Sequence, residues 1–206
     1  MGHLDVLRFF QKAIKRSGLP IAYSEGFNPH QLLSFAAPLS VGVESGGEYF
    51  DMELVSPVDE AEIVGALSSA MVDGMDISAA RLLPEKSKNC MASVTAAAYT
   101  IHFDDGMGRA FHEFVDGSDR IVITKKTKKS EREIDLKPLI YECSMEAQDA
   151  DDVYIVLPCG STENIKPQLL IEAFLSYKDI KDLKYSLYRR ELYQGERSNL
   201  SSLLEV

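Results

Sequence analysis

Apolar residues recur with the 3.6-residue period of a helix from Leu4 to Ser17. The opposite side of this segment carries a basic stripe, and Gly18 and Pro20 follow directly after it. Glycine tolerates the left-handed conformation that ends many helices, and proline does not continue them. The pattern therefore predicts an amphipathic helix that ends near Ser17. The members of the basic stripe are Arg8, Lys12, Lys15 and Arg16.

The stretch S-E-G-F-N-P-H at residues 24–30 predicts a shaped turn after this helix. Gly26 tolerates a positive φ, and Asn28 precedes proline and therefore avoids the helical region. Pro29 fixes its own φ. Beyond the turn, residues 32–43 are rich enough in apolar residues to form a strand, which we expect to bend at Pro38.

A second strand is predicted over residues 48–54 after the S-G-G-E connection, because apolar and polar residues alternate there. Phe50, Met52 and Leu54 share the buried side of that pattern. Asp59 then marks the start of a helix that extends to about Met71. Residues 77–83 close the unit as a strand.

The second half of the chain repeats this mixed pattern after the polar linker at 84–89. We expect helices near 108–116 and 166–176, and strands near 96–103, 120–126, 134–145, 153–158 and 183–193. The predicted fold is α+β, with two ferredoxin-like units of the βαββαβ type, the first lacking its N-terminal strand. The predicted domains are residues 1–88 and 89–195, followed by a flexible tail at 196–206.

Composition limits the kinds of protein that this chain resembles. Its 206 residues have a formal net charge of -10, which opposes indiscriminate coating of nucleic acid. The three cysteines are widely spaced and fit neither a disulfide framework nor a C-x-x-C site. No apolar run is long enough to span a bilayer, and the first residues do not resemble a secretory signal. We therefore expect a cytoplasmic protein that has no membrane contact.

His30, together with Asp5 or Glu48, forms one candidate catalytic group, because these side chains can act as general acids and bases. The structural alternative is that they satisfy the free backbone groups of helix ends and turns. Their spacings do not suggest a metal site, and we expect none. Nucleotide-binding loops such as G-x-G-x-x-G and the Walker motif are absent from the sequence.

A second hypothesis is that the basic stripe and the turn bind single-stranded nucleic acid, because cations beside flat rings suit phosphates and bases. The alternative is a solvated helix face. A secondary basic patch follows at Lys125, Lys126, Lys128 and Lys129, and its simpler explanation is a charged hairpin tip that keeps a sheet edge soluble. The candidate binding residues are His3, Arg8, Lys12, Arg16, Tyr23, Ser24, Phe27, Asn28, His30 and Ser34.

The run from H-L-D-V-L-R-F-F to S-E-G-F-N-P-H, followed by L-S-F-A-A-P-L-S-V-G-V-E-S and E-Y-F-D-M-E-L, resembles the radical SAM-linked protein family, a domain of unknown function numbered DUF2344. The similarity continues through E-I-D-L-K-P-L-I and R-R-E-L-Y. It is most specific over residues 3–54. Relatives carry a strand before the equivalent of His3, which is why the first sheet is expected to lack one strand.

The resemblance implies a domain fused to, or encoded beside, a radical SAM protein that carries a cobalamin domain. This chain lacks the three-cysteine loop that holds an iron-sulfur cluster. The cluster, S-adenosylmethionine and cobalamin are therefore expected in the partner, and no cofactor is expected in this chain. The leading hypothesis is an accessory module that presents RNA to the partner. The alternatives are a stand-alone RNA-acting enzyme that uses His30, and a protein-protein adaptor that binds through the incomplete sheet edge.

Overall fold

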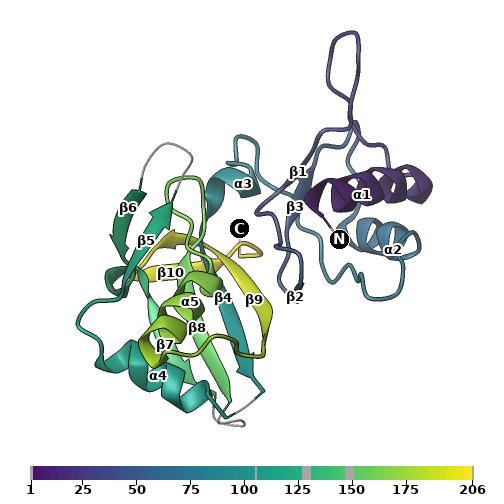
Figure 1. The fold of residues 1–206 in the computed structure, drawn as a ribbon. Coiled ribbons are helices and arrows are strands. Elements are labelled where there is room, and N and C mark those ends of the chain that lie inside the picture. The colour runs from purple at the N-terminus through teal and green to yellow at the C-terminus, as the bar shows by residue number, and fades with distance from the viewer. Residues whose placement is uncertain (1, 105, 127–130, 147–150, 206) are drawn as a thin grey trace. The chain divides into compact units, whose positions relative to one another are not determined.

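The computed structural model describes residues 2–104, 106–126, 131–146 and 151–205. The chain is α+β, as predicted, and divides into two compact units (Figure 1). Each unit is described by itself. Unit 1 comprises Met1–Val41, Tyr49–Ser93 and Leu203–Val206, and unit 2 comprises Gly42–Glu48 and Val94–Ser202.

The described residues of unit 1 form three helices and a small antiparallel sheet. The helices are α1 (His3–Ser17), α2 (Glu60–Ser68) and α3 (Cys90–Ser93), and the strands are β1 (Leu33–Phe35) and β3 (Phe50–Met52). Helix α1 confirms the amphipathic prediction. It ends at Gly18, which has a φ of 76°, a conformation that glycine adopts without strain.

Helix α2 begins where the sequence predicts, because the Asp59 side chain accepts a hydrogen bond from the Ala61 backbone N–H at 2.9 Å. Residues 77–83, however, are not a strand, and that prediction was wrong. Glu60 holds part of this segment through its side chain instead. It accepts hydrogen bonds from the Leu82 backbone N–H and from the Arg81 guanidinium, both at 3.0 Å.

The core of unit 1 lies between the two longer helices and the sheet. It is built around five buried side chains, namely Ile14, Leu19, Ile21, Ile63 and Leu67. Phe50, Met52 and Leu54 pack against this cluster, which confirms the alternation predicted for their strand. Burial of these apolar surfaces is the main source of the unit's stability.

The single strand predicted over residues 32–43 is divided between the two units. Strand β1 pairs antiparallel with β3 in unit 1, with Ser34 opposite Asp51. Strand β2 (Val43–Ser45) instead joins unit 2, where it pairs in parallel with a strand from the C-terminal part of the chain. The segment between them contains Pro38, which has no N–H to donate to a ladder.

The described part of unit 2 is built on one large sheet with two helices. After β2 its elements are β4 (Val94–Phe103), α4 (Gly108–Gly117), β5 (Val122–Lys126), β6 (Glu131–Asp135), the 3₁₀ turn η1 (Lys137–Leu139), β7 (Glu142–Met145), β8 (Asp152–Pro158), α5 (Pro167–Lys178), β9 (Tyr185–Glu196) and β10 (Asn199–Ser202). The strand order is β10-β9-β4-β8-β7, with β2 also beside β9.

The chain order β4-α4-β7-β8-α5-β9 within this sheet is the βαββαβ order expected for the second half. Both helices pack on one side of the sheet, because the Phe103 ring contacts Phe111 of α4 and Phe174 of α5. Strands β5 and β6 form a separate antiparallel pair inserted between α4 and β7.

Two further predictions for unit 2 differ from the structure. The strand expected over 134–145 is interrupted by η1, which contains Pro138, and so appears as β6 and β7. Residues 199–202, expected in a flexible tail, instead form β10. This strand pairs antiparallel with the end of β9 through a turn, so its backbone groups are hydrogen-bonded. Among the described helices none has the length and apolar character needed to cross a membrane.

Candidate functional site

Helix α1 presents its basic stripe away from the core of unit 1. Arg8, Lys12 and Lys15 are exposed, whereas Ala13 and Ile14 on the other side are fully buried. Arg8 makes only a loose ion pair with Asp5, at 3.8 Å between exposed side chains. Such a pair contributes little to stability, so it leaves the Arg8 guanidinium available to a ligand.

Arg16, the fourth member of the stripe, has a structural partner. Its guanidinium donates a 2.7 Å hydrogen bond to the Ala70 carbonyl just after α2, and it lies 6.0 Å from the centre of the Phe9 ring. These contacts fasten α1 to the end of α2. The stripe available for binding is therefore centred on Arg8, Lys12 and Lys15.

His3 and Asp5, at the start of α1, also make contacts that explain them structurally. The His3 ring lies edge-on to Phe35 of β1, with ring centres 5.8 Å apart. It thereby extends a cluster of mutually contacting rings formed by Phe10, Phe35 and Phe50. The Asp5 carboxylate accepts a 3.3 Å hydrogen bond from the Gly2 backbone N–H. A carboxylate in the first helical turn is favourable because of the helix dipole.

Residues 24–30 form a closed loop rather than a simple turn. The Ser24 backbone N–H donates to the His30 carbonyl at 2.8 Å, and the His30 backbone N–H donates to Ser24 Oγ at 3.1 Å. Ser24 Oγ and His30 Nδ1 are a further 2.8 Å hydrogen-bonded pair. These contacts fix the neck of the loop, and Gly26, with a φ of 112°, allows its sharp turn.

The loop projects from unit 1, beyond α1, as Figure 1 shows. The Phe27 side chain at its tip is fully exposed, at 110%, and Asn28 beside it is also exposed. Tyr23 precedes the neck and is 50% exposed. The exposed Phe27 ring is therefore available for contact with another molecule.

Gln31 joins the base of the loop to α1. Its side-chain N–H donates a 3.2 Å hydrogen bond to the Gln11 carbonyl, and its backbone bridges Tyr23. Arg8 and Lys15 are three residues before and four residues after Gln11, so they lie on the same side of the helix. The base of the loop and the basic stripe thus belong to one region of unit 1.

Ser34 contributes its backbone to a buried joint that the sequence did not indicate. The Ser34 carbonyl is 3.4 Å from Cys90 Sγ, and the Asp51 carboxylate accepts a 2.6 Å hydrogen bond from the Cys90 backbone N–H. Burial, together with the Asp51 charge, raises the pKa of the Cys90 thiol to about 12. This thiol stays protonated at neutral pH and is a poor nucleophile.

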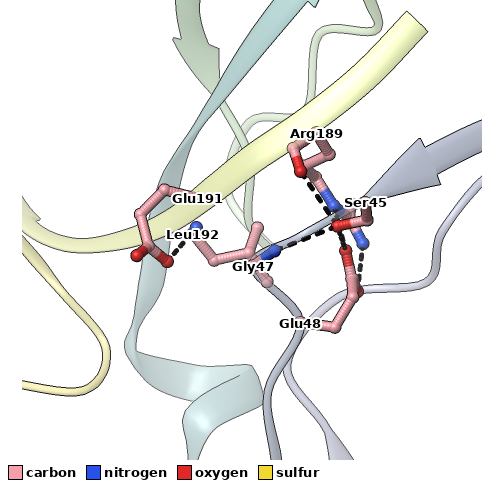
Figure 2. Close-up of polar contacts among 6 residues, drawn as sticks. All are labelled: Ser45, Gly47, Glu48, Arg189, Glu191 and Leu192. Atoms are coloured by element: carbon pink, nitrogen blue, oxygen red, sulfur yellow. Dashed lines mark hydrogen bonds and ion pairs between the residues drawn. The ribbon is translucent and has the colours of Figure 1, made fainter. Parts of the chain in front are cut away.

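Glu48, proposed from sequence as a catalytic carboxylate, is bound to a buried arginine in unit 2. The Arg189 guanidinium donates through Nε and Nη2 to the two Glu48 oxygens, both at 2.6 Å (Figure 2). Its side chain is only 3% exposed, whereas that of Glu48 is 35% exposed. Bidentate geometry of this kind gives both strength and a fixed orientation.

Ser45 completes this polar network. Its hydroxyl contacts Glu48 Oε1 at 2.5 Å and the Arg189 carbonyl at 3.0 Å, as Figure 2 shows. Burial by itself lowers the pKa of Arg189, but its hydrogen bonds to Glu48 prevail and raise the pKa above its ordinary value. Burial also raises the pKa of the neighbouring Tyr99 to about 12. The network therefore holds β2 against β9 and is suited to structure rather than to proton transfer.

Half of the secondary basic patch lies beyond the described part of the chain. Lys125 and Lys126 are the last residues of β5, opposite Arg132 and Glu131 of β6. Lys128 and Lys129 lie outside the described residues. The hairpin expected here is confirmed as far as its two strands, and the binding prediction stays a prediction.

The described residues bring together Arg8, Lys12 and Lys15 with the base of the loop, and join Ser24 to His30. The sequence did not indicate that Arg189 and Gln31 are buried, because these polar residue types are usually exposed. It also did not indicate the contacts of Cys90, because Ser34 and Asp51 are far from it in the chain. Within the described ranges, no three His, Cys, Asp or Glu side chains are grouped so that they can hold a metal ion.

Comparison with known proteins identifies a family. No curated protein matches this chain. The model of one family, described as an uncharacterized protein conserved in bacteria, matches residues 1–167 of the 206. The match covers unit 1 up to Ser93, and it ends at the first residue of α5 in unit 2. The chain therefore belongs to the DUF2344 family.

Proposed function

We propose that this chain is a non-catalytic recognition module that binds single-stranded RNA and presents it to a radical SAM protein in the cytoplasm. In this proposal the partner holds the iron-sulfur cluster, S-adenosylmethionine and cobalamin. The observation that carries the proposal is the exposed basic stripe of α1, formed by Arg8, Lys12 and Lys15 beside the base of the loop.

The distribution of charge in unit 1 supports α1 as the phosphate contact. All the lysines and arginines among the first 80 residues are in this helix. The net charge of -10 repels a phosphate backbone at long range, so RNA has to approach where cations are concentrated. Three cations on one helix face provide such a place, and they are suited to a short single strand.

The half-exposed Tyr23 ring supplies a surface on which a base can stack. Tyr23 pairs with Gln31, and Gln31 in turn contacts α1 at Gln11. Stacking on an aromatic ring contributes about 1–3 kcal/mol per base and tolerates any sequence. Cations with one nearby ring favour single-stranded RNA over a duplex, whose bases are already stacked.

The contacts of the candidate catalytic residues favour recognition over catalysis. The His30 ring is hydrogen-bonded to Ser24 in the neck of the loop, and Asp5 contacts Gly2 and Arg8 at the start of α1. Glu48 belongs to unit 2 and is bound by Arg189. A catalytic acid-base pair needs its two groups in mutual contact, whereas the described contacts of these three side chains are with other residues.

The proposal is tested by RNA binding with two charge-reversal pairs. In the test variant Lys12 and Lys15 become glutamate, and in the control variant Lys86 and Lys88, which are exposed in the same unit, become glutamate. Both variants have the same net charge. Fluorescence anisotropy with a labelled single-stranded RNA of about 12 nucleotides measures the affinity of each.

We expect the Lys12 and Lys15 pair to weaken binding at least tenfold more than the control pair, because only the test pair removes direct phosphate contacts. Equal losses in the two variants contradict the proposal, since they show that net charge alone controls binding. No binding by the unmodified chain also contradicts it.

A further inference from the structure

Phe27 differs in its surroundings from the residues of the proposed RNA surface. It is at the tip of a loop whose neck is closed by the contacts between Ser24 and His30, and it is fully exposed. The nearest charged residue in the sequence is Glu25, a carboxylate that is also exposed. The loop itself contains no lysine or arginine.

Outside α1, the charged residues of unit 1 up to Ala80 are all acidic. Between Ser17 and Ala80 unit 1 has no lysine or arginine but eight carboxylates. These are Glu25, Asp51, Glu53, Asp59, Glu60, Glu62, Asp73 and Asp76. A phosphate backbone at the tip of the loop would be repelled by the Glu25 carboxylate, and the loop has no lysine or arginine to attract it. RNA is therefore a poor partner for Phe27.

We propose that the tip of the 24–30 loop docks on a protein, with Phe27 entering an apolar pocket whose rim carries lysine or arginine opposite Glu25. The inference rests on the proposed function for the identity of that protein, the radical SAM partner. It assigns the α1 stripe and the tip of the loop to different ligands. The α1 stripe contacts RNA, and the loop contacts the partner.

The closed neck supports this assignment because it presents the ring in a fixed frame. Three hydrogen bonds join Ser24 and His30, and Pro29 restricts the chain just before the neck. A preorganised loop loses less conformational entropy when it binds. A single large side chain that fills a pocket commonly dominates the affinity of an interface.

The test uses the full chain and the purified radical SAM protein encoded beside it, with affinity measured by isothermal titration calorimetry. Phe27→Ala is compared with Val55→Ala, which removes another exposed apolar side chain of unit 1. Both changes are at exposed positions, so neither disturbs the core. RNA binding by each variant is measured in parallel.

We expect Phe27→Ala to weaken binding to the partner by about 30-fold or more, the effect of losing a hot-spot side chain. Val55→Ala should change this affinity less than twofold, and both variants should bind RNA as the unmodified chain does. Equal affinity of Phe27→Ala and the unmodified chain for the partner overturns the inference while leaving the proposed function in place.

Two other outcomes also overturn it. A loss of RNA affinity in Phe27→Ala shows that the tip contacts RNA instead of protein. Failure of the unmodified chain to bind the radical SAM protein overturns the proposed partner together with this use of the loop. RNA binding through α1 is tested separately, with the Lys12 and Lys15 charge-reversal pair.

Glu25 and the neck provide additional variants. We expect Glu25→Lys to weaken the partner complex because the rim of the pocket is basic, and to reduce the sensitivity of that complex to salt. Ser24→Ala removes two of the neck contacts and should weaken the complex several-fold, since the loop is then less ordered before binding. If Glu25→Lys binds the partner more strongly, the proposal that the pocket has a basic rim is wrong.

Discussion

The guanidinium of Arg189 and the carboxylate of Glu48 form two 2.6 Å hydrogen bonds although 141 residues separate them in the sequence. The contact attaches β2, which lies between β1 and β3 in the chain, to β9 of the large sheet in unit 2. The role of Glu48 in this contact is therefore to stabilise the fold.

Glu48→Ala should lower the free energy of unfolding by about 2–3 kcal/mol, because it removes the carboxylate that balances the buried Arg189 charge. This value is below the full cost of breaking a buried pair, since Glu48 itself is partly exposed. Chemical denaturation by urea measures the change. The matched control is Arg81→Ala, which removes an ion pair with Glu60 between more exposed side chains and should cost less than about 1 kcal/mol.

A double variant distinguishes charge from packing at this site. Replacing Glu48 by glutamine and Arg189 by methionine removes both charges, and should recover part of the stability lost in Glu48→Ala. If Glu48→Ala is as stable as the unmodified chain, the network does not hold β2 in place.

Gly47→Ala should destabilise unit 2, because a Cβ at this position would lie 2.4 Å from the Arg190 carbonyl oxygen. The clash is with backbone, which does not move freely, so we expect a loss of about 1–3 kcal/mol in unfolding free energy. Gly65→Ala in α2 is the control. Its Cβ meets no atom within 4 Å, and alanine favours helix, so stability should rise by up to about 1 kcal/mol. Equal effects at both positions would contradict the close packing at Gly47.

Stability should fall as the pH rises above 9. Burial raises the pKa of the Cys90 and Cys143 thiols from the ordinary value of 9.0 to about 12, and that of Tyr99 from 10.0 to about 12. These groups therefore release protons in the unfolded chain before they do so in the folded one. Their contribution is complete below pH 9 and is lost progressively towards pH 12.

Urea titrations at pH 7.5, 9.5 and 10.5 measure this dependence, with Cys90→Ala as the comparison. The slope of unfolding free energy against pH above 9 should be smaller in Cys90→Ala, because one of the shifted groups is absent. An identical slope in the two proteins would show that the Cys90 thiol ionises in the folded chain as readily as in the unfolded one.

The parts of the fold that depend on local patterns were predictable from the sequence. Helix α1 follows from its apolar period, and its end follows from Gly18 and Pro20. The start of α2 follows from Asp59, whose side chain caps the helix. In each case the residues that determine the structure are neighbours in the chain, so their spacing contains the information.

Pairing between distant segments was not predictable in the same way. Residues 32–43 read as one strand, but β1 pairs with β3 whereas Val43 pairs with Leu187. Nothing local to Val43 specifies a partner so far along the chain. The segment at 77–83 shows the same limit, since the Glu60 side chain holds it in an irregular conformation despite its apolar composition.

For the candidate site, the sequence predicted which residues are exposed better than it predicted their partners. Phe27 and Tyr23 are exposed as a binding surface requires, whereas Arg16 is bound to the Ala70 carbonyl. The sequence predicted a turn at 24–30, but the contacts between Ser24 and His30 close it into a loop. A side-chain contact of this kind depends on backbone geometry that composition does not specify.

The salt dependence of RNA binding is the most direct measurement of the central claim, that the α1 stripe contacts phosphates. With a labelled single-stranded RNA, the logarithm of the association constant should fall linearly with the logarithm of salt concentration, with a slope near -2 for contacts from Arg8, Lys12 and Lys15, at about 0.7 per phosphate. Lys12→Ala should reduce the steepness by about 0.7. An unchanged slope in Lys12→Ala, Lys15→Ala and Arg8→Ala would contradict the account.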